Sequence, residues 1–279
     1  MPGAAGADVA MGHPAGGVAC YLLNLDRSPG RLSHARMALE SVGLSPVRVP
    51  GVDGATLSDG ERSLADPRAS RRVTGRMLSD GELGCYLGHL RALRRMLADG
   101  VPYALVCEDD VRPDPALGAV CAALSERGGD WKVAILANPA RRLFTPIDLL
   151  DIAGRHFTVQ RAHYPPMNAW ANLWTRAGAE EMVREFDRPL EPWDHAVRRF
   201  AQRSDAAIAL DPSPIAQPED QSEIDARGSR FDRDLLYRWR KWRRLSQQKR
   251  RARALMRTSP VPANGATSPA RQNLPNSRR

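Results

Sequence analysis

The sequence is poor in aromatic residues and cysteines, and it has no long apolar run. Aromatic residues make up only 6% of the 279 residues, but the hydrophobic content of 42% is still compatible with a globular fold. The four cysteines contain no Cys-x-x-Cys pair, which argues against a zinc site or a disulfide framework and favours a reducing compartment. No stretch approaches the roughly 20 apolar residues of a membrane-spanning helix. Residues 1–17 lack the basic and apolar regions of a secretory signal, so we expect a cytoplasmic protein.

Charge is distributed unevenly along the chain, although the net charge is only +9. Residues 227–279 contain 16 Lys and Arg against two Asp, whereas residues 1–226 contain 25 basic and 30 acidic residues. A mildly acidic body followed by a strongly basic tail indicates an anionic partner for the tail, either a membrane surface or a nucleic acid. No DNA- or RNA-binding motif accompanies the basic residues, so nucleic acid is the less favoured partner.

The order of apolar runs and helix signals predicts an α/β fold. The first 50 residues are typical of a strand, a helix and a second strand, which is how a parallel sheet begins. Residues 51–78 are predicted to form a long loop with at most one helical turn. A helix at 80–99 then precedes a buried strand at 103–107. Further strands are predicted at 131–136, 157–160, 169–174 and 206–210, and further helices at 115–124, 176–186 and 193–200.

The composition changes along the chain divide it into four segments. The ends are rich in small and polar residues and are predicted to be disordered, whereas the middle has the strand and helix pattern of a catalytic domain. The segments are a disordered N-terminus (1–17), an α/β catalytic domain (18–226), a basic Trp/Arg amphipathic helix (227–257) and a disordered tail (258–279).

Three adjacent carboxylates, Glu108, Asp109 and Asp110, follow directly on the buried strand at 103–107. Because side chains alternate along an extended chain, Glu108 and Asp110 are expected on one side and Asp109 on the other. Two oxygen ligands at the C-terminal end of a buried strand suit a divalent cation that keeps open positions for phosphate groups. The alternative is that the acids simply close the strand and face water, and the motif alone does not separate the two.

Three sequence blocks occur in a recognisable order. They are Tyr-Leu-Leu-Asn-Leu-Asp-Arg-Ser-Pro-Gly-Arg at 21–31, Gly-Glu-Leu-Gly-Cys-Tyr-Leu-Gly-His-Leu at 81–90 and Glu-Asp-Asp-Val at 108–111. Together they resemble glycosyltransferase family 25, which includes lipooligosaccharide, lipopolysaccharide and collagen galactosyltransferases. Segments 176–180, 193–195 and 217–224 look like later blocks of the family, so the resemblance covers about residues 18–226. The chain departs from the family at Gly88, where Ser is usual, and at 168–169, where Gly-Thr is usual.

The resemblance implies a fold, a cofactor and a reaction. The fold is a GT-A-like nucleotide-sugar-binding α/β fold with a mostly parallel central sheet flanked by helices. The cofactor is Mn²⁺ or Mg²⁺. The reaction is transfer of a sugar, commonly galactose from UDP-galactose with inversion, onto a lipooligosaccharide or lipopolysaccharide core or a related glycan. Two alternatives remain, a family member without activity and a polyanion- or nucleic-acid-binding protein that acts through its basic tail.

Seven residues are candidates for binding the nucleotide-sugar donor. Amide and carboxylate side chains at the end of the first strand can bind base or ribose, and arginines there can bind phosphate. The alternative for this block is a helix cap with solvated arginines. In the next block the histidine is alternatively structural, and the glycine permits close approach of a helix or a ligand. The candidates are Asn24, Asp26, Arg27, Arg31, Gly84, His89 and Asp109.

Four further residues are candidates for metal binding and for catalysis. We assign Asp110 as a direct metal ligand and Glu108 as a second ligand or the holder of a metal-bound water. An inverting transfer needs a base near the acceptor hydroxyl, usually a carboxylate, and Asp194 is the candidate. His195 could share the role of base or ligand. The alternative for Asp194 is that it only caps a helix.

The Trp/Arg helix at 227–257 has two possible roles. It could lie in the headgroup plane of an anionic bilayer with its tryptophans inward, which would place the enzyme peripherally on the inner membrane beside a lipid-linked acceptor. Alternatively, the stripe that carries Trp239 and Trp242 packs on the catalytic domain and the arginines are solvated.

Overall fold

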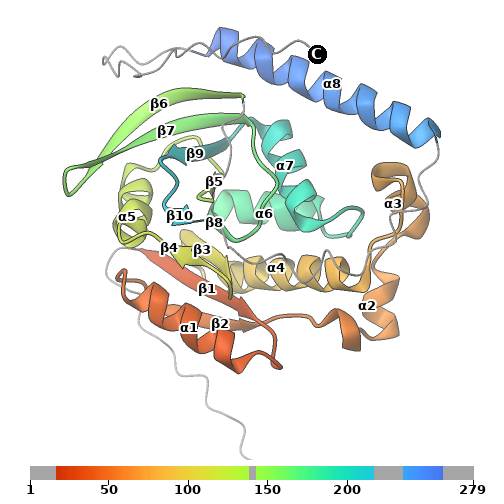
Figure 1. Cartoon of the computed structure of the whole chain (residues 1–279), viewed down its shortest axis with the longest axis horizontal. Coiled ribbons are helices and arrows are strands. Elements are labelled where there is room, and N and C mark those ends of the chain that lie inside the picture. Colours follow the sequence, from red (N-terminus) through yellow and green to blue (C-terminus); the bar gives the residue numbers. More distant parts are fainter. Residues whose placement is uncertain (1–16, 138–142, 217–234, 260–279) are drawn as a thin grey trace, which may run out of the picture.

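The centre of the molecule is an eight-stranded sheet with the strand order β2-β1-β3-β8-β5-β9-β7-β6 (Figure 1). The computed structural model describes residues 17–137, 143–216 and 235–259. All strands of this sheet except β8 and β7 run in one direction, which confirms the predicted α/β fold with a mostly parallel central sheet. The strands are β1 (Val18–Asn24), β2 (Pro46–Pro50), β3 (Tyr103–Glu108), β5 (Val133–Ile135), β6 (Leu143–Ile152), β7 (Arg155–Tyr164), β8 (Ala171–Thr175) and β9 (Ala207–Asp211). A separate two-stranded sheet joins β4 (Arg112–Pro113) to β10 (Ile215–Ala216).

Helices cover both faces of the sheet and bury two apolar layers against it. On one face, α4, α6 and α7 contribute Leu93, Met182 and Phe200 to a cluster with the strands. On the other face, α1 and α5 contribute Leu39 and Val120 to a second cluster. Because both faces are covered, strands such as β1 and β3 are apolar along almost their whole length. These helices are α1 (Pro29–Glu40), α4 (Asp80–Ala98), α5 (Leu117–Arg127), α6 (Arg176–Glu185) and α7 (Trp193–Ser204).

The predicted long loop at residues 51–78 is wrong, because this segment contains a 3-10 helix, η1 (Gly54–Thr56), and two α-helices, α2 (Asp59–Ser63) and α3 (Pro67–Thr74). Their start signals are local: α2 begins with a capping box and α3 with an Asp N-cap followed by proline. The helices are too short to show an apolar repeat, which is why periodicity missed them.

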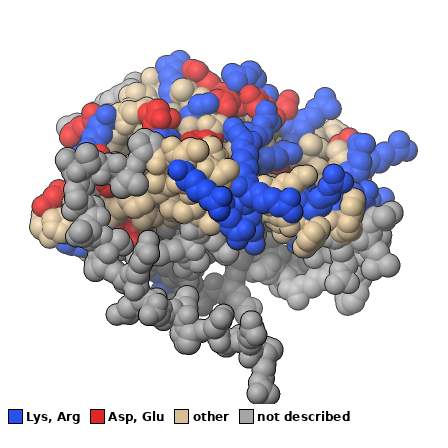
Figure 2. All heavy atoms as spheres, turned by 90° about the horizontal axis from the view of Figure 1, so that it is seen from above, with Lys and Arg blue, Asp and Glu red and all other residues tan. Residues whose placement is uncertain are grey.

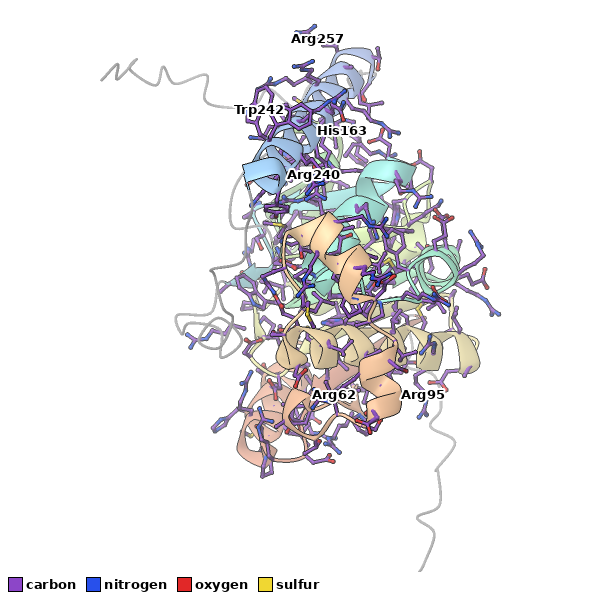
Figure 3. The ribbon with its side chains drawn as sticks, turned by 90° about the vertical axis from the view of Figure 1, so that its right-hand side faces the viewer. Arg62, Arg95, His163, Arg240, Trp242 and Arg257 are labelled. Atoms are coloured by element: carbon purple, nitrogen blue, oxygen red, sulfur yellow. The ribbon has the colours of Figure 1, made fainter. Side chains whose placement is uncertain are left out.

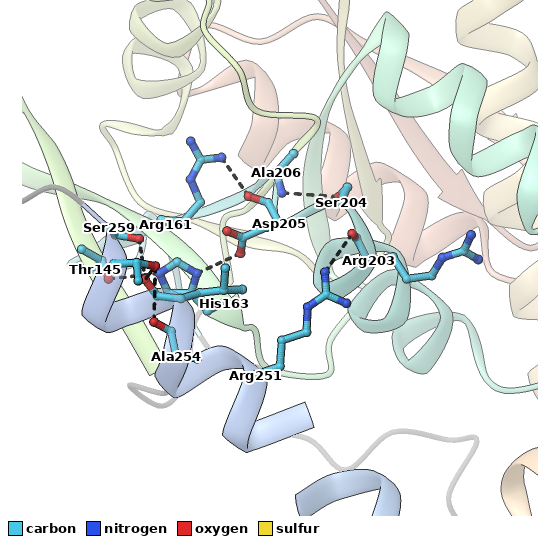
Figure 4. Close-up of polar contacts among 12 residues, drawn as sticks. Thr145, Arg161, His163, Arg203, Ser204, Asp205, Ala206, Arg251, Ala254 and Ser259 are labelled. Atoms are coloured by element: carbon cyan, nitrogen blue, oxygen red, sulfur yellow. Dashed lines mark hydrogen bonds and ion pairs between the residues drawn. The ribbon is translucent and has the colours of Figure 1, made fainter. Parts of the chain in front are cut away.

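The strand predicted at 157–160 is part of a longer hairpin formed by β6 and β7. The hairpin carries buried His163, whose Nε2 lies 3.0 Å from Oγ1 of Thr145 and whose Nδ1 lies 2.8 Å from Oδ1 of Asp205 (Figure 4). These contacts join the outer strands of the sheet to the end of α7. β6 was not predicted because its exposed face interrupts the apolar run.

The basic helix α8 (Leu235–Thr258) lies over α7 and the β6–β7 hairpin and reaches α3 (Figure 1). Tyr237 is buried beside Gly75, where an added Cβ would lie 2.6 Å from the tyrosine ring. Arg244 Nη1 donates a 2.7 Å hydrogen bond to the carbonyl of Val73 at the end of α3. Near its C-terminal end, Ala252 is also buried. One side of α8 is therefore attached to the domain along most of its length.

The tryptophans of α8 lie on its other side. Trp239 is 54% exposed and Trp242 is 64% exposed, so the alternative in which the Trp stripe packs on the catalytic domain is wrong. Within the described ranges, no helix has both the length and the apolar character needed to cross a membrane. The predicted disordered segments at 1–17 and 258–279, and the start of the helix predicted at 227–257, fall almost entirely outside the described residues.

Candidate active site

The acidic run lies at the carboxyl edge of the parallel strands, where β3 ends beside β1. Glu108 is the last residue of β3 and is in register with Leu23 of β1, so Asn24 at the end of β1 lies next to the start of the acidic turn. Parallel pairing brings the ends of both strands to the same edge, which is where open α/β sheets bind ligands. The edge therefore collects polar groups from two of the three N-terminal sequence blocks.

Asp109 is held by two partners from the first block. Its Oδ2 accepts a 2.7 Å hydrogen bond from Nδ2 of Asn24, and its Oδ1 lies 2.5 Å from Nη2 of Arg31. Asn24 is 98% buried and its Nδ2 also donates to the carbonyl of Ser28. Asp109 thus differs from its two acidic neighbours in being bonded to Asn24, and it ties the turn after β3 to the start of α1.

Asp110 is the acid without a complete set of partners. Its Oδ1 is buried and forms no hydrogen bond, while its Oδ2 lies 3.8 Å from Nη2 of Arg31. Burial, followed by the negative charge of Glu108, raises the pKa of Asp110 to about 6, and the charge of Arg31 only partly opposes this. A buried carboxylate oxygen beside a second carboxylate is a donor set that a hard divalent cation fits. The residues present are therefore compatible with a Mn²⁺ or Mg²⁺ site.

Glu108 points toward α4, where it contacts two side chains of the second block. His89 Nε2 lies 2.9 Å from Glu108 Oε1, and Cys85 Sγ lies 3.8 Å from the same oxygen. Cys85 and His89 are four residues apart and so share one face of α4. One potential ligand atom from each of Cys85, His89 and Glu108 lies within 4.8 Å of the others.

The argument from the cysteines against a zinc site did not take Cys85 into account, which lies with His89 and Glu108 in a group that could hold a metal ion. The four-residue spacing to His89 was the signal that could have found it, because a helix aligns side chains at that spacing. A search for Cys-x-x-Cys pairs does not detect a cluster whose third member comes from a distant strand.

The start of α7 lies beside His89 and so adjoins the cluster of Cys85, His89 and Glu108. The ring of Trp193 stacks on His89 at 5.0 Å between centroids with an interplanar angle of 10°. Asp194 follows, and burial raises its pKa, with the charge of Glu108 adding to the effect while His195 opposes it. Burial lowers the pKa of His195, so its imidazole is mainly neutral near pH 7. Asp194 Oδ1 accepts the backbone N–H of His195 at 2.8 Å. The N-cap of α7 is Pro192 and no side chain caps this helix, so the alternative in which Asp194 only caps a helix is wrong.

Asp26 and Arg27 lie at the rim, and Asp26 reaches the acidic run only indirectly, through Arg48 and Asn24. Asp26 pairs with Arg48, whose Nε also donates a 3.2 Å hydrogen bond to Oδ1 of Asn24. Arg27 pairs with Asp53 in the segment before η1. Both side chains are at least half exposed.

Gly84 brings α4 close to the segment that follows β2. A Cβ at Gly84 would lie 2.4 Å from the carbonyl oxygen of Val52, so only glycine permits this approach. Gly88, one turn later, has no such contact, since its nearest neighbour would be 3.7 Å away. The packing role of Gly84 therefore has a direct structural basis, and Gly88 leaves room for a Cβ.

Comparison with known proteins gives matches over the same part of the chain. The model of the family described as "Glycosyltransferase family 25 (LPS biosynthesis protein)" matches residues 18–136. A "Glycosyltransferase 25 family member" of Anopheles gambiae is 30% identical over 181 residues, which are 59% of this chain and 28% of the relative. A protein of the same description from Aedes aegypti is 36% identical over 104 residues, which are 34% of this chain and 16% of the relative.

Some relatives carry a different description. The human "Inactive glycosyltransferase 25 family member 3" is 34% identical over 96 residues, which are 33% of this chain and 16% of the relative. The chain thus spans less than a third of the length of each of these relatives. The last block at 217–224 lies outside the described residues.

Proposed function

Because the chain belongs to glycosyltransferase family 25 through residues 18–136, we propose that it transfers a sugar from a nucleotide-sugar donor to a glycan acceptor. The donor proposed is UDP-galactose, the outcome is inversion, and the acceptor is a lipooligosaccharide or lipopolysaccharide core or a related glycan. The observation that carries the proposal is the buried, unpartnered oxygen of Asp110 at the edge where Asn24, Arg31 and Glu108 meet.

The metal would be Mn²⁺ or Mg²⁺, held by Asp110 with Glu108 as second ligand or as holder of a bound water. A bound divalent cation supplies charge neutralisation for a diphosphate leaving group. Arg31 is 42% exposed beside Asp109 and Asp110, so its guanidinium can also meet a phosphate oxygen at the mouth of the site.

The side chains of the first block differ in whether they are exposed and able to contact the donor. Asn24 is buried and already donates to Asp109 and Ser28, so it positions the acidic turn rather than contacting the nucleotide. Asp26 and Arg27 are exposed at the rim and are the proposed contacts to ribose and phosphate. Gly84 and His89 shape the wall of the site, and Asp109 holds the turn.

Asp194 is the proposed base. It is partly buried at the start of α7, and its raised pKa means that a proton taken from an acceptor hydroxyl is held more firmly than by an exposed carboxylate. His195 lies next to it as a neutral imidazole that can share the proton. The two side chains lie at the end of the site that α7 and α4 enclose.

The first experiment measures donor and metal together. Thermal shift is recorded for the whole chain with a panel of nucleotide sugars, each with and without Mn²⁺. We expect stabilisation that needs both a UDP-sugar and Mn²⁺, lost in Asp110→Asn and kept in Glu126→Gln, which removes an exposed acid on α5. No response to any nucleotide sugar in the presence of Mn²⁺ would argue against the proposal.

A second experiment addresses the base. We expect Asp194→Asn to lower kcat by roughly 10²- to 10⁴-fold while the donor-dependent thermal shift is retained. The matched variant is Asp187→Asn, an exposed acid just before α7, which should leave kcat unchanged. Turnover near the wild-type value in Asp194→Asn would remove Asp194 from the mechanism. A protein that binds donor and Mn²⁺ but transfers no sugar to any acceptor or to water would favour the inactive alternative, which the names of some relatives suggest.

A further partner proposed for this enzyme is an anionic membrane surface, reached through the helix at 227–257. Whether that helix can bind a membrane depends on the side chains that it exposes.

A further inference from the structure

One side of α8 presents tryptophan and arginine to solvent. Each exposed residue has another of the set three, four or seven positions away, which places them on one side of a helix. We call this surface the Trp/Arg face of α8, and it consists of Trp239, Trp242, Arg243, Arg250, Arg253 and Arg257. In the side view, Trp242 and Arg257 lie on α8 at one end of the molecule (Figure 3).

The opposite side of α8 is the attached side, which gives the helix a fixed orientation. Tyr237 and Ala252 are buried, and Arg244 is bonded to the end of α3. Arg251, between the two sides, donates a 3.5 Å hydrogen bond to the carbonyl of Arg203 at the end of α7 (Figure 4). The Trp/Arg face is therefore directed away from the domain because of how the other side is held.

The charge of this surface has one sign. α8 contains ten Lys and Arg and no Asp or Glu over Leu235–Thr258. Seen from the side of α8, Lys and Arg side chains form a band along the helix (Figure 2). Arg243 lies over the ring of Trp239 at 5.4 Å, so guanidinium and indole are presented together. Such a surface is complementary to a dense layer of negative charge that also accepts aromatic rings.

We propose that the Trp/Arg face of α8 docks on an anionic lipid bilayer. Tryptophan prefers the boundary between headgroups and acyl chains, and arginine binds lipid phosphates. The face runs along a helix whose other side is held against the domain. We therefore favour a planar membrane surface over the groove of a nucleic acid. If the protein is a transferase, as proposed above, the acceptor that docking implies is a membrane-embedded glycolipid.

The test uses the full chain and vesicles of phosphatidylcholine, alone or mixed with phosphatidylglycerol. We expect co-sedimentation only with the anionic vesicles, weakened by added salt because exposed charges are screened. Tryptophan fluorescence should shift to shorter wavelength on binding, because only Trp239 and Trp242 among the described tryptophans are exposed. The variants Trp239→Ser/Trp242→Ser and Arg253→Glu/Arg257→Glu should each bind about tenfold more weakly or worse.

The control variant is Arg36→Glu/Arg94→Glu, which reverses two exposed arginines on α1 and α4 and should bind as the wild type does. Equal binding by the wild type and the double tryptophan variant would overturn the proposal. So would binding of a double-stranded oligonucleotide without binding of anionic vesicles. The donor-dependent thermal shift is measured in the same variants. A variant that keeps this shift but no longer binds vesicles supports docking through α8. If the wild type shows no donor-dependent shift, the transferase function is contradicted and the docking is not.

Discussion

The side-chain amide of Asn24 donates a 2.7 Å hydrogen bond to Oδ2 of Asp109, across 85 positions of sequence. Asn24 ends β1 and Asp109 begins the turn after β3, so this bond fixes the relative position of the two segments that line the candidate active site. The other oxygen of Asp109, Oδ1, forms an ion pair with Arg31. By contrast, the buried Oδ1 of Asp110 forms no hydrogen bond.

Asn24→Ala should destabilise the fold because it leaves the buried oxygen of Asp109 with one partner fewer. We expect the free energy of unfolding to fall by about 1–3 kcal/mol, the usual cost of an unsatisfied buried polar group. Asp26→Ala removes a surface pair with Arg48 and should cost no more than about 1 kcal/mol. Urea denaturation of both variants measures the difference, and equal costs would mean that the bond to Asp109 does not hold the turn.

Gly84→Ala and Gly88→Ala form a matched pair one helical turn apart on α4. The added methyl at Gly84 would lie 2.4 Å from Val52 O, so the variant must displace backbone and should lose about 1–3 kcal/mol. At Gly88 the nearest atom is 3.7 Å away, and alanine should be neutral or stabilise the helix by up to about 1 kcal/mol. Thermal unfolding of both variants tests the pair. A stable Gly84→Ala protein would contradict the close approach of α4.

The raised pKa of Asp110 predicts a pH-dependent stability of the metal-free protein. The folded chain binds this proton more tightly than the unfolded chain, because the pKa is about 6 instead of 3.8. The contribution of Asp110 to stability therefore falls as pH rises from 3.8 through about 6.

In Asp110→Asn the side chain stays neutral, so its Tm relative to wild type should increase across this window and level off at higher pH. Addition of Mn²⁺ at a pH above the window should raise the Tm of the wild type and not of the variant. Calorimetry at a series of pH values measures both effects. A Tm difference between the two proteins that is independent of pH would show that Asp110 is not the titrating group.

The cluster of Cys85, His89 and Glu108 predicts a preference among metals. A thiol and an imidazole favour Zn²⁺ over Mn²⁺, which prefers carboxylate oxygens. We expect Zn²⁺ to bind more tightly than Mn²⁺ to the whole protein, and Cys85→Ser to weaken Zn²⁺ by more than about tenfold with little effect on Mn²⁺. Equilibrium dialysis with each metal tests this. Cys121→Ala, which removes a buried thiol in the other apolar layer, is the control and should change neither affinity.

The strands and long helices of the N-terminal half were predictable because their signals are local. The apolar runs of β1 and β3 are buried on both faces, and α4 begins with a capping box at Ser79 and Glu82. The short helices α2 and α3 and the strand β6 were missed, since each lacks a long apolar repeat. These three elements are stabilised by contacts with the rest of the fold and do not show a periodic apolar pattern.

The candidate site was predictable only in part. The grouping of the acids with Asn24 and Arg31 follows from the parallel pairing of β1 and β3, which brings the ends of both strands to the same edge of the sheet. The approach of Cys85 to Glu108 was not, because it depends on how α4 is rotated against the sheet. The functional roles assigned to the site residues all remain predictions.

The sequence by itself determined that this chain has an α/β domain with three acids closing a buried strand, and a separate basic helix with tryptophans. Those features depend on residue type and spacing within one segment. Only the tertiary structure decided that Asp109 is bonded whereas an oxygen of Asp110 is left without a partner. It also decided that the Trp/Arg face of α8 points away from the domain. Both outcomes depend on which side of a turn or helix is held by distant residues, and spacing along the chain does not contain that information.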